Sequence, residues 1–305
     1  MGFFSSFPLS LQQAGAIFLS IIIEALPFVL IGALISGFIE VYIDPDKVTK
    51  WLPKQKTLAI LFGCIIGFFF PSCECGIVPI INRFLEKNFP SYTAIPFLVT
   101  APIMNPLVLF ATYSAFGNSW KMALFRALGS FLLGILLGIL LGFVWPESIQ
   151  KDDSDLGHQH ANHHRKGGQK VFQALVEAVD EFFDMGRYLV LGSLFAALVQ
   201  VYIPTRILTS ITSNPLASIG LLMLLSFLLS LCSEADAFIA SSLISSFGFA
   251  PVLAFLVIGP VLDVKNLLMM RASFTSSFIL RFMLVTISTV FVYSYLMGVL
   301  LWFDF

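Results

Sequence analysis

The sequence FPSCECG, residues 70–76, interrupts a long apolar part of the chain. An apolar run leads into it from Leu58, and a second run continues after it to Ile81. Proline stops a helix because it has no backbone N–H and clashes with the preceding turn. A carboxylate inside a bilayer costs roughly 2.5–3.5 kcal/mol on insertion scales, so such a group usually faces a cavity or a partner. The stretch therefore predicts a helix that is broken at membrane depth, with polar chemistry at the break.

The composition is typical of a membrane protein. Of the 305 residues, 58% are hydrophobic and 11% are charged, whereas soluble domains have about 25% charged residues. Apolar runs close to the roughly 20 residues of a spanning helix recur along the chain. The net charge of -1 and the lack of a basic patch give no sign of nucleic-acid binding. We expect an all-α, multi-pass membrane protein in contact with the lipid bilayer.

Polar and small residues recur at matched positions in the two parts of the sequence. At an offset of 160 residues, Glu74 overlays Glu234 and Gly32 overlays Gly192. Chance similarity between apolar helices would not readily place polar groups at matched positions. We therefore predict two homologous halves with interrupted or re-entrant helices, namely a first transmembrane repeat at residues 1–146 and a second at residues 171–305. Interrupted segments at corresponding positions of two repeats point to a transport site near the middle of the bilayer. The sequence leaves open whether the repeats are parallel or inverted.

A polar linker, residues 147–170, joins the two predicted repeats. Its low hydrophobicity and mixed charge predict a flexible segment. Neutral imidazole is the commonest metal ligand, so metal capture by the linker is one interpretation. The other is a polar linker that happens to be rich in histidine, and we favour it for the transport step itself. The linker holds all four histidines of the chain: His158, His160, His163 and His164.

Cys73 and Cys75 flank Glu74 in the broken segment. Thiolates favour Zn(II), Cu(I) and other thiophilic species, so the two cysteines are candidate ligands for a metal or a thiophilic solute. In an unwound segment, sulfurs two residues apart can converge. The alternative is two small buried hydrophobic side chains, a common role of cysteine. A bound metal ion is thus an open alternative, and we expect no other cofactor.

Carboxylates recur at the predicted interruptions. Glu74, Glu234 and Asp236, with Ser233 beside the last two, could hold a cation, exchange a proton with the solute, or cap the start of a half-helix, because a helix N-terminus stabilises negative charge. If the two carboxylates of the second half lie close together, one of them should have a raised pKa and could carry protons.

Four further polar positions lie in matched apolar segments. Asn105 overlays Asp263 at an offset of 158 residues, and both fall in the second interruption of their half. They either complete a polar lining or lie in loops at the membrane interface, and the segment Asp263–Asn266 could hold an intramembrane ion pair. Glu24 and Asp184 fall in matched first helices, where we expect Asp184 in water and leave Glu24 open.

Three arginines next to or within apolar runs are expected at helix ends. Arg126, Arg271 and Arg281 each border or interrupt an apolar run.

Three blocks of the sequence, FFFPSCECGIVPIINRFL, PFLVTAPIMNP and SEADAFIASSL, resemble the YraQ/ArsP permease family, and the resemblance covers nearly the whole chain. It implies an integral-membrane permease of the bacterial cytoplasmic membrane with two related halves. One branch of the family exports trivalent organoarsenicals, which implies that the cysteines of the first block, here Cys73 and Cys75, handle a thiophilic substrate in that branch. Some members of the family occur beside metal-homeostasis proteins in Gram-positive bacteria, which implies a role linked to metals. Such members often accompany a second small membrane protein, which implies a heteromeric partner.

Together these features predict a permease, not an enzyme, that moves a small and thiophilic solute (a metal, a metalloid or an organoarsenical) by alternating access. The sequence has no GxxxxGK[ST] phosphate loop, so we expect no ATPase domain in this chain. One alternative is a non-transporting membrane subunit or scaffold of a heteromeric complex linked to metal homeostasis. A third interpretation, a membrane thiol oxidoreductase using Cys73 and Cys75, has the least support.

Overall fold

The structure is a computed structural model that describes residues 9–42, 52–53, 55–70, 74–145, 149–150, 167–202 and 214–302. Cys73 and the four linker histidines lie outside these residues, so the predictions made for them are not addressed by the fold. The described part is helical, with one isolated β-bridge between Gln150 and Phe274. Its helices are α1 (Leu9–Tyr42), α3 (Lys56–Phe69), α4 (Glu74–Glu86), α5 (Ser91–Met104), α6 (Pro106–Ala115), α7 (Trp120–Ile139), the π-helical continuation η2 (Leu140–Val144), α8 (Gly167–Tyr202), α9 (Pro215–Leu229), α10 (Ser233–Phe247), α11 (Phe249–Ile258), α12 (Val264–Ser273) and α13 (Ser276–Trp302).

Among the described residues, four segments are long and apolar enough to cross a bilayer: Ser10–Ile39, Ser91–Ala115, Trp120–Val144 and Ser276–Leu300. Apolar helices α3, α9 and α11 are shorter, with 14, 15 and 10 residues, and a helix of that length falls short of the roughly 20 residues needed to span. The prediction of an all-α, multi-pass membrane protein is confirmed.

The first predicted interruption is present. Helix α3 ends at Phe69, Phe70 is extended, and α4 begins at Glu74. The Phe70 ring packs edge-on against Phe97 of α5, with ring centroids 5.5 Å apart, so the end of α3 is held against the core. Glu74 therefore lies at the start of a helix inside the bundle.

The second predicted interruption is confined to Asn105, between α5 and α6. Proline usually breaks a helix, but α5 continues through Pro96 and Pro102 and ends at Met104. Proline is tolerated in membrane helices because neighbouring helices and hydroxyl side chains compensate for the lost hydrogen bond. Here the Thr100 hydroxyl donates to the Pro96 carbonyl at 2.9 Å. The break falls at Asn105, immediately before α6.

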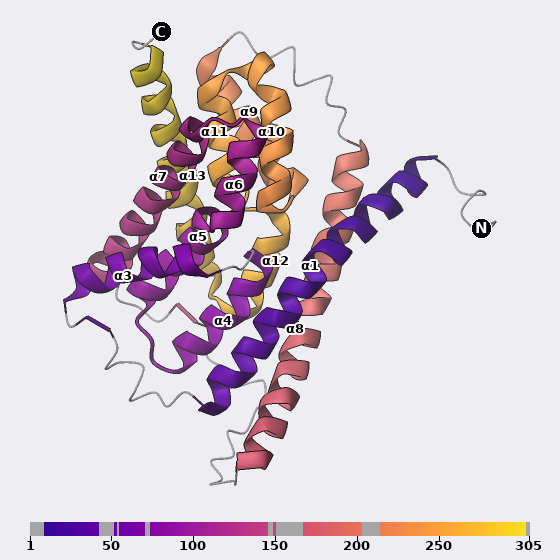
Figure 1. Cartoon of the computed structure of the whole chain (residues 1–305), viewed down its shortest axis with the longest axis vertical. Coiled ribbons are helices and arrows are strands. Elements are labelled where there is room, and N and C mark those ends of the chain that lie inside the picture. Colours follow the sequence, from indigo (N-terminus) through magenta and orange to yellow (C-terminus); the bar gives the residue numbers. More distant parts are fainter. Residues whose placement is uncertain are drawn as a thin grey trace.

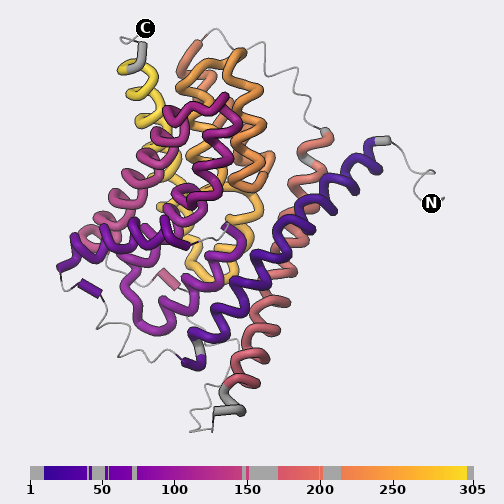
Figure 2. Tube along the Cα trace, in the orientation of Figure 1, coloured from indigo at the N-terminus to yellow at the C-terminus, as the bar shows by residue number. Residues whose placement is uncertain are grey.

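Helices α1 and α8 lie side by side along one flank of the bundle and run in opposite directions (Figure 1). Leu11, near the start of α1, shares a pocket with Leu194 and Leu198, near the end of α8. The trace in Figure 2 shows the same opposite course of the two helices from N- to C-terminus.

Helices α7 and α13 are antiparallel as well. The Tyr293 hydroxyl, near the end of α13, donates to the Phe125 carbonyl near the start of α7 at 2.7 Å. Gln150, beyond α7, pairs with Phe274, just before α13. If the two halves are repeats, these directions make them inverted; the repeat itself stays a prediction.

Two glycines bring the long helices onto the helices that carry the site. A Cβ added to Gly32 of α1 would lie 2.9 Å from the Cα atom of Gly76 in α4. A Cβ added to Gly192 of α8 would lie 2.9 Å from the Cα atom of Lys265 in α12. Small residues allow such close approach of membrane helices. The two glycines that match in sequence thus position α4 and α12.

The second part of the chain packs directly on the first. Arg83 of α4 pairs with Glu181 and Glu177 of α8, at 3.0 and 3.6 Å. Helix α8 begins at Gly167, inside the stretch that we predicted as linker. The boundaries proposed for the two repeats stay predictions.

Candidate functional site

A buried ion pair joins α4 to α12. The Lys265 ammonium lies 3.1 Å from Glu74 Oε1, and the two side chains are 3% and 1% exposed. Glu74 is the first residue of α4, and Lys265 is in the first turn of α12. The pair lies 191 residues apart in sequence. Removing Lys265 would leave the Glu74 carboxylate uncompensated in the interior, which is why buried charges are normally paired.

The starts of α4 and α10 meet at this pair. The hydroxyl of Ser233, the first residue of α10, donates a hydrogen bond to Glu74 Oε2 at 3.4 Å. Both residues directly follow an interruption of their helix. The partial positive charge of a helix N-terminus stabilises a carboxylate, so the predicted capping position of Glu74 and its place in a charge cluster coexist.

The position of Arg126 contradicts one of our predictions. We expected it at a helix end, but it lies inside α7 and is fully buried. Its guanidinium donates to three groups from three other elements: Thr112 Oγ1 at 2.8 Å, the Ser233 carbonyl at 3.0 Å and the Leu256 carbonyl at 3.1 Å. A planar guanidinium presents five N–H donors in a fixed fork, which suits such a junction. Arg126 therefore holds the start of α10 in place.

Asn105 and Asp263 both cap helices. Asn105 Oδ1 accepts from Leu107 N–H at 2.9 Å at the start of α6. Asp263 Oδ1 accepts from Asn266 N–H at the start of α12. Asp263 Oδ2 also lies 3.9 Å from Lys265 Nζ, so the segment does hold an intramembrane ion pair. The stronger partner of Lys265 is nevertheless Glu74, on another helix.

Asp236 is a buried carboxylate in the first turn of α10. Neither of its oxygens has a hydrogen-bond partner among the described residues. A Cβ added to Gly259 would lie 2.5 Å from both Asp236 Oδ2 and Ser226 Oγ, so only glycine leaves room for the carboxylate there. The largest charge interaction of Asp236 is with Arg126.

The buried charges of this region do not balance. Two buried cations, Arg126 and Lys265, are accompanied by three buried carboxylates, Glu74, Asp236 and Asp263. A buried, unpaired charge is strongly disfavoured. One further positive charge, a proton or a cation, would therefore balance the cluster.

A small cavity lies beside the ion pair. Its volume is about 20 Å³, which is sufficient for one water molecule or a small ion. Glu24 of α1, Cys232 and Cys75 lie in its wall. The full lining is Ile21, Glu24, Ala25, Glu74, Cys75, Ser230, Leu231, Cys232 and Lys265.

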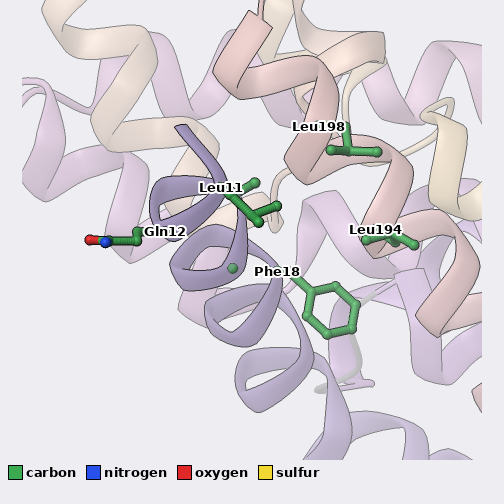
Figure 3. Close-up of a pocket in the computed structure, with 7 residues that line it drawn as sticks. Leu11, Gln12, Phe18, Leu194 and Leu198 are labelled. Carbon is green, nitrogen blue, oxygen red and sulfur yellow. The ribbon is translucent and has the colours of Figure 1, made fainter. Parts of the chain in front are cut away.

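A larger pocket between α1 and α8 is apolar and holds no charged side chain (Figure 3). Its volume is about 270 Å³. Phe18, Leu194 and Leu198 line it, and Gln12 extends away from the other labelled side chains in Figure 3. Such a surface is expected to contact lipid and gives no basis for chemistry.

The predicted residues are thus partly brought together. Glu74, Ser233 and Asp263 gather around Lys265, and Cys75 lines the cavity beside them. Glu234 accepts a hydrogen bond from the Cys232 thiol at 3.1 Å. Asp184 pairs with Arg187 at 3.3 Å on the exposed side of α8, so it stays outside the site as expected.

Lys265 and Arg126 are the two site residues that sequence reasoning undervalued. Lys265 was noted only as part of a local ion pair. For Arg126 a signal was present, because it lies among apolar residues and glycines on both sides, and an intramembrane charge by default marks a functional site.

Comparison with known proteins gives the family. A family model described as "Predicted permease" (ArsP_1) matches residues 10–299. A protein of Streptococcus mutans, named as a candidate subunit of a two-component membrane permease complex, is 59% identical over 98% of this chain and 100% of its own length. The UPF0718 protein YcgR of Bacillus subtilis is 43% identical over 93% of this chain and 95% of its own. No solved structure matches significantly.

The family match covers both parts of the chain, including the positions of the buried cluster. With the apolar helices of the fold, the matches identify a multi-pass cell-membrane permease, a transporter and not an enzyme. The chain belongs to the ArsP_1 family of predicted permeases.

Proposed function

We propose that this permease moves a small thiophilic solute by alternating access around the cluster of Glu74, Lys265 and Ser233. The observation that carries the proposal is the Glu74–Lys265 ion pair with Ser233 hydrogen-bonded to the same carboxylate. It joins helices from distant parts of the chain at the points where their backbone is interrupted. In transporters, sites of this kind lie between repeats and are formed by discontinuous helices.

The opposite directions of α1 and α8 support an inverted pair of repeats around this centre (Figure 1). Inverted repeats allow one half to rock against the other, which opens a central site to each side in turn. The contacts that would exchange in such a motion are those between the halves, above all Lys265 with Glu74 and Arg126 with Ser233.

Two thiols support a thiophilic solute. Cys75 and Cys232 both line the cavity, one from each interrupted segment. Soft sulfur ligands select soft metals and related thiophilic species. Cys73 lies two positions before Cys75, and we propose that it joins them when the solute binds. Glu234, Asp236 and the caps Asn105 and Asp263 would complete the polar lining.

The excess of buried carboxylates supports coupling to a positive charge. Three carboxylates accompany two cations in the buried cluster. A proton or the solute itself would supply the missing charge, so transport would respond to a proton gradient or would carry net charge.

Flux into proteoliposomes tests the proposal. The purified full-length chain is reconstituted, and uptake of Zn²⁺, Cd²⁺, arsenite and trivalent methylarsenite is followed by elemental mass spectrometry. We expect the wild-type chain to take up at least one of these solutes faster than empty liposomes, and Glu74→Gln to abolish that uptake. Asp184→Asn is the matched control, because Asp184 lies outside the cluster. Uptake by Glu74→Gln at the wild-type rate would contradict the assignment.

A second candidate function is a subunit of a heteromeric complex. It is supported by the name of the Streptococcus mutans relative, which refers to a two-component complex. A second membrane protein would then be required for flux. Purification from native membranes under mild detergent tests this: a partner that co-purifies in constant ratio, with no flux unless it is present, would favour the subunit. Flux by this chain alone would reject the non-transporting form of this function.

The metal-linked role of the linker stays a separate proposal. Replacing His158, His160, His163 and His164 together by alanine should leave flux unchanged if the linker does not take part in the transport step. A loss of flux in that variant would assign metal delivery to the linker.

A further inference from the structure

The geometry points to a site for a borderline-soft divalent cation such as Zn²⁺, formed by Glu24, Cys232 and Glu234 with Cys75 as a fourth ligand. This inference rests on the proposed function for its place in the transport path and names the class of solute. It differs from the expectation that Cys73 and Cys75 alone hold the solute, since its central ligand is in the second interrupted segment.

The first observation is the convergence of three ligand groups from two helices. Glu24 lies in α1, Cys232 immediately precedes α10, and Glu234 lies in the first turn of α10. One ligand atom from each of these three residues lies within 4.8 Å of the other two. Ligand atoms of a tetrahedral zinc ion, about 2.0–2.3 Å from the metal, are roughly 3.3–3.8 Å apart. The Cys232 sulfur already lies 3.1 Å from Glu234 Oε2. A small closing movement of Glu24 would complete three ligands.

The second observation is a buried thiol at the same cavity. Cys75 is 1% exposed, carries no disulfide, and lines the cavity with Glu24 and Cys232. No hydrogen bond to its sulfur is found among the described residues. The cavity volume of about 20 Å³ is suited to a single ion or water molecule. A fourth ligand from α4 would give the four-coordination typical of zinc.

The third observation is the charge around the three ligands. Glu24 lies in the middle of the apolar helix α1, where an ionised carboxylate is costly without a partner. No ion pair joins Glu24 or Glu234 to a basic side chain in the part of the chain that the structure describes. The nearby Lys265 is already paired with Glu74 and Asp263. Two carboxylates and a thiol therefore share a site that lacks its own cation.

The ligand set decides the class of ion. Carboxylates alone favour Mg²⁺ and Ca²⁺, whereas thiolates favour softer metals. One or two sulfurs with two carboxylate oxygens favour a borderline divalent ion over a trivalent arsenical that needs several thiolates. The Cys232 proton, now donated to Glu234, would be released to solvent when the metal binds, because only the thiolate is a ligand.

Cadmium binding to the full-length chain in lipid nanodiscs tests the inference. Cd²⁺ is titrated under a phosphine reductant, binding is followed by the thiolate-to-cadmium charge-transfer absorption, and the amount bound is measured by elemental mass spectrometry. We expect one Cd²⁺ per chain, displaced by Zn²⁺ and not by Mg²⁺. Cys232→Ser should weaken binding by at least about 100-fold. Glu24→Gln or Glu234→Gln should weaken it by at least about 10-fold, because each removes an anionic ligand and even the loss of a group that only supports a ligand costs about 10–100-fold.

Cys64→Ser is the matched control, because Cys64 is a buried free thiol that does not line the cavity. It should bind Cd²⁺ as the wild type does. The two glutamine variants are nearly isosteric with glutamate, so they keep the test valid if Cys232→Ser does not fold. Wild-type binding by Cys232→Ser, equal competition by Mg²⁺, or the absence of binding to the wild type would each overturn the inference.

The binding test is independent of transport. If Cd²⁺ binds through Cys232 but Glu74→Gln transports normally, the proposed transport centre is wrong and the metal site stands. If Glu74→Gln abolishes flux but no cadmium–thiolate absorption depends on Cys232, the metal site is wrong and the transport centre stands.

Discussion

Lys265 pairs with Glu74 at 3.1 Å across 191 residues of sequence, in a part of the bundle where neither side chain reaches solvent. The pair fastens the start of α12 to the start of α4. Ser233, at the start of α10, shares the same carboxylate. Three interrupted or capped helix starts are thus held by one acidic residue.

The ion pair predicts a specific pattern of stability. Lys265→Gln should destabilise the fold by about 3–5 kcal/mol, because it leaves the buried carboxylates of Glu74 and Asp263 without their cation. Glu74→Gln should cost less, because Lys265 keeps Asp263 as a partner. The double variant should lose less than the sum of the two single losses, because Glu74 no longer remains as a buried carboxylate without its cation. Unfolding of the detergent-solubilised protein, followed by circular dichroism, measures the three free energies. Additive losses would show that the two charges do not interact.

No other basic residue should be able to replace Arg126 without a loss of stability. Arg126→Lys keeps the charge but cannot donate to Thr112, Ser233 and Leu256 together, and each lost hydrogen bond to a charged group is worth about 1.5–3 kcal/mol. We expect a loss of at least about 3 kcal/mol in the free energy of unfolding. Arg187→Lys, on the exposed side of α8, should change it by less than about 0.5 kcal/mol. Equal effects of the two variants would contradict the role given to Arg126.

Gly32 and Gly15 offer a matched pair on one helix. Alanine at position 32 would bring its Cβ against the Gly76 backbone of α4, whereas a Cβ at position 15 meets nothing within 4 Å. Gly32→Ala should destabilise the fold by about 1–3 kcal/mol and reduce flux, because overpacking forces the backbone apart. Gly15→Ala should be neutral or stabilising by up to about 1 kcal/mol. Thermal unfolding of the two variants measures the difference in stability. A Gly32→Ala variant as stable as the wild type would contradict the close approach of α1 and α4.

Replacing Asp236 should change the stability of the fold much less than breaking the Glu74–Lys265 ion pair. Because neither carboxylate oxygen is hydrogen-bonded in the described part of the chain, Asp236→Asn should leave the free energy of unfolding within about 1 kcal/mol of the wild type. The measurement is the midpoint of thermal unfolding beside that of Glu74→Gln. A large loss in Asp236→Asn would show that attraction to Arg126 stabilises the fold.

Local sequence information was sufficient for the class of fold and for the first break. Apolar length predicts spanning helices, and the FPSCECG segment separates α3 from α4 as proline chemistry requires. The same rule was wrong for Pro96 and Pro102, because burial of α5 by its neighbours stabilises a helix that its own hydrogen bonds do not complete.

The site was harder to predict because its contacts are long-range. The carboxylate of Glu74 was recognised, but nothing local indicates that its cation is Lys265 of α12. Arg126 was assigned to a helix end since arginine is usually exposed, and only its three distant acceptors show otherwise. The Glu24–Cys232–Glu234 cluster likewise depends on the approach of Glu24 in α1 to the residues at the start of α10, which a one-dimensional pattern does not contain.

Two-sided labelling of Cys232 tests the central claim, alternating access to the cavity, most directly. In a Cys64→Ser variant, which keeps the proposed solute ligands, right-side-out and inside-out vesicles are treated with a membrane-impermeant maleimide, and labelling of Cys232 is measured by mass spectrometry of its peptide. The account predicts labelling from both faces, because the cavity beside Cys232 opens to each side in turn. Labelling from one face alone, with flux retained, would contradict alternating access at this site.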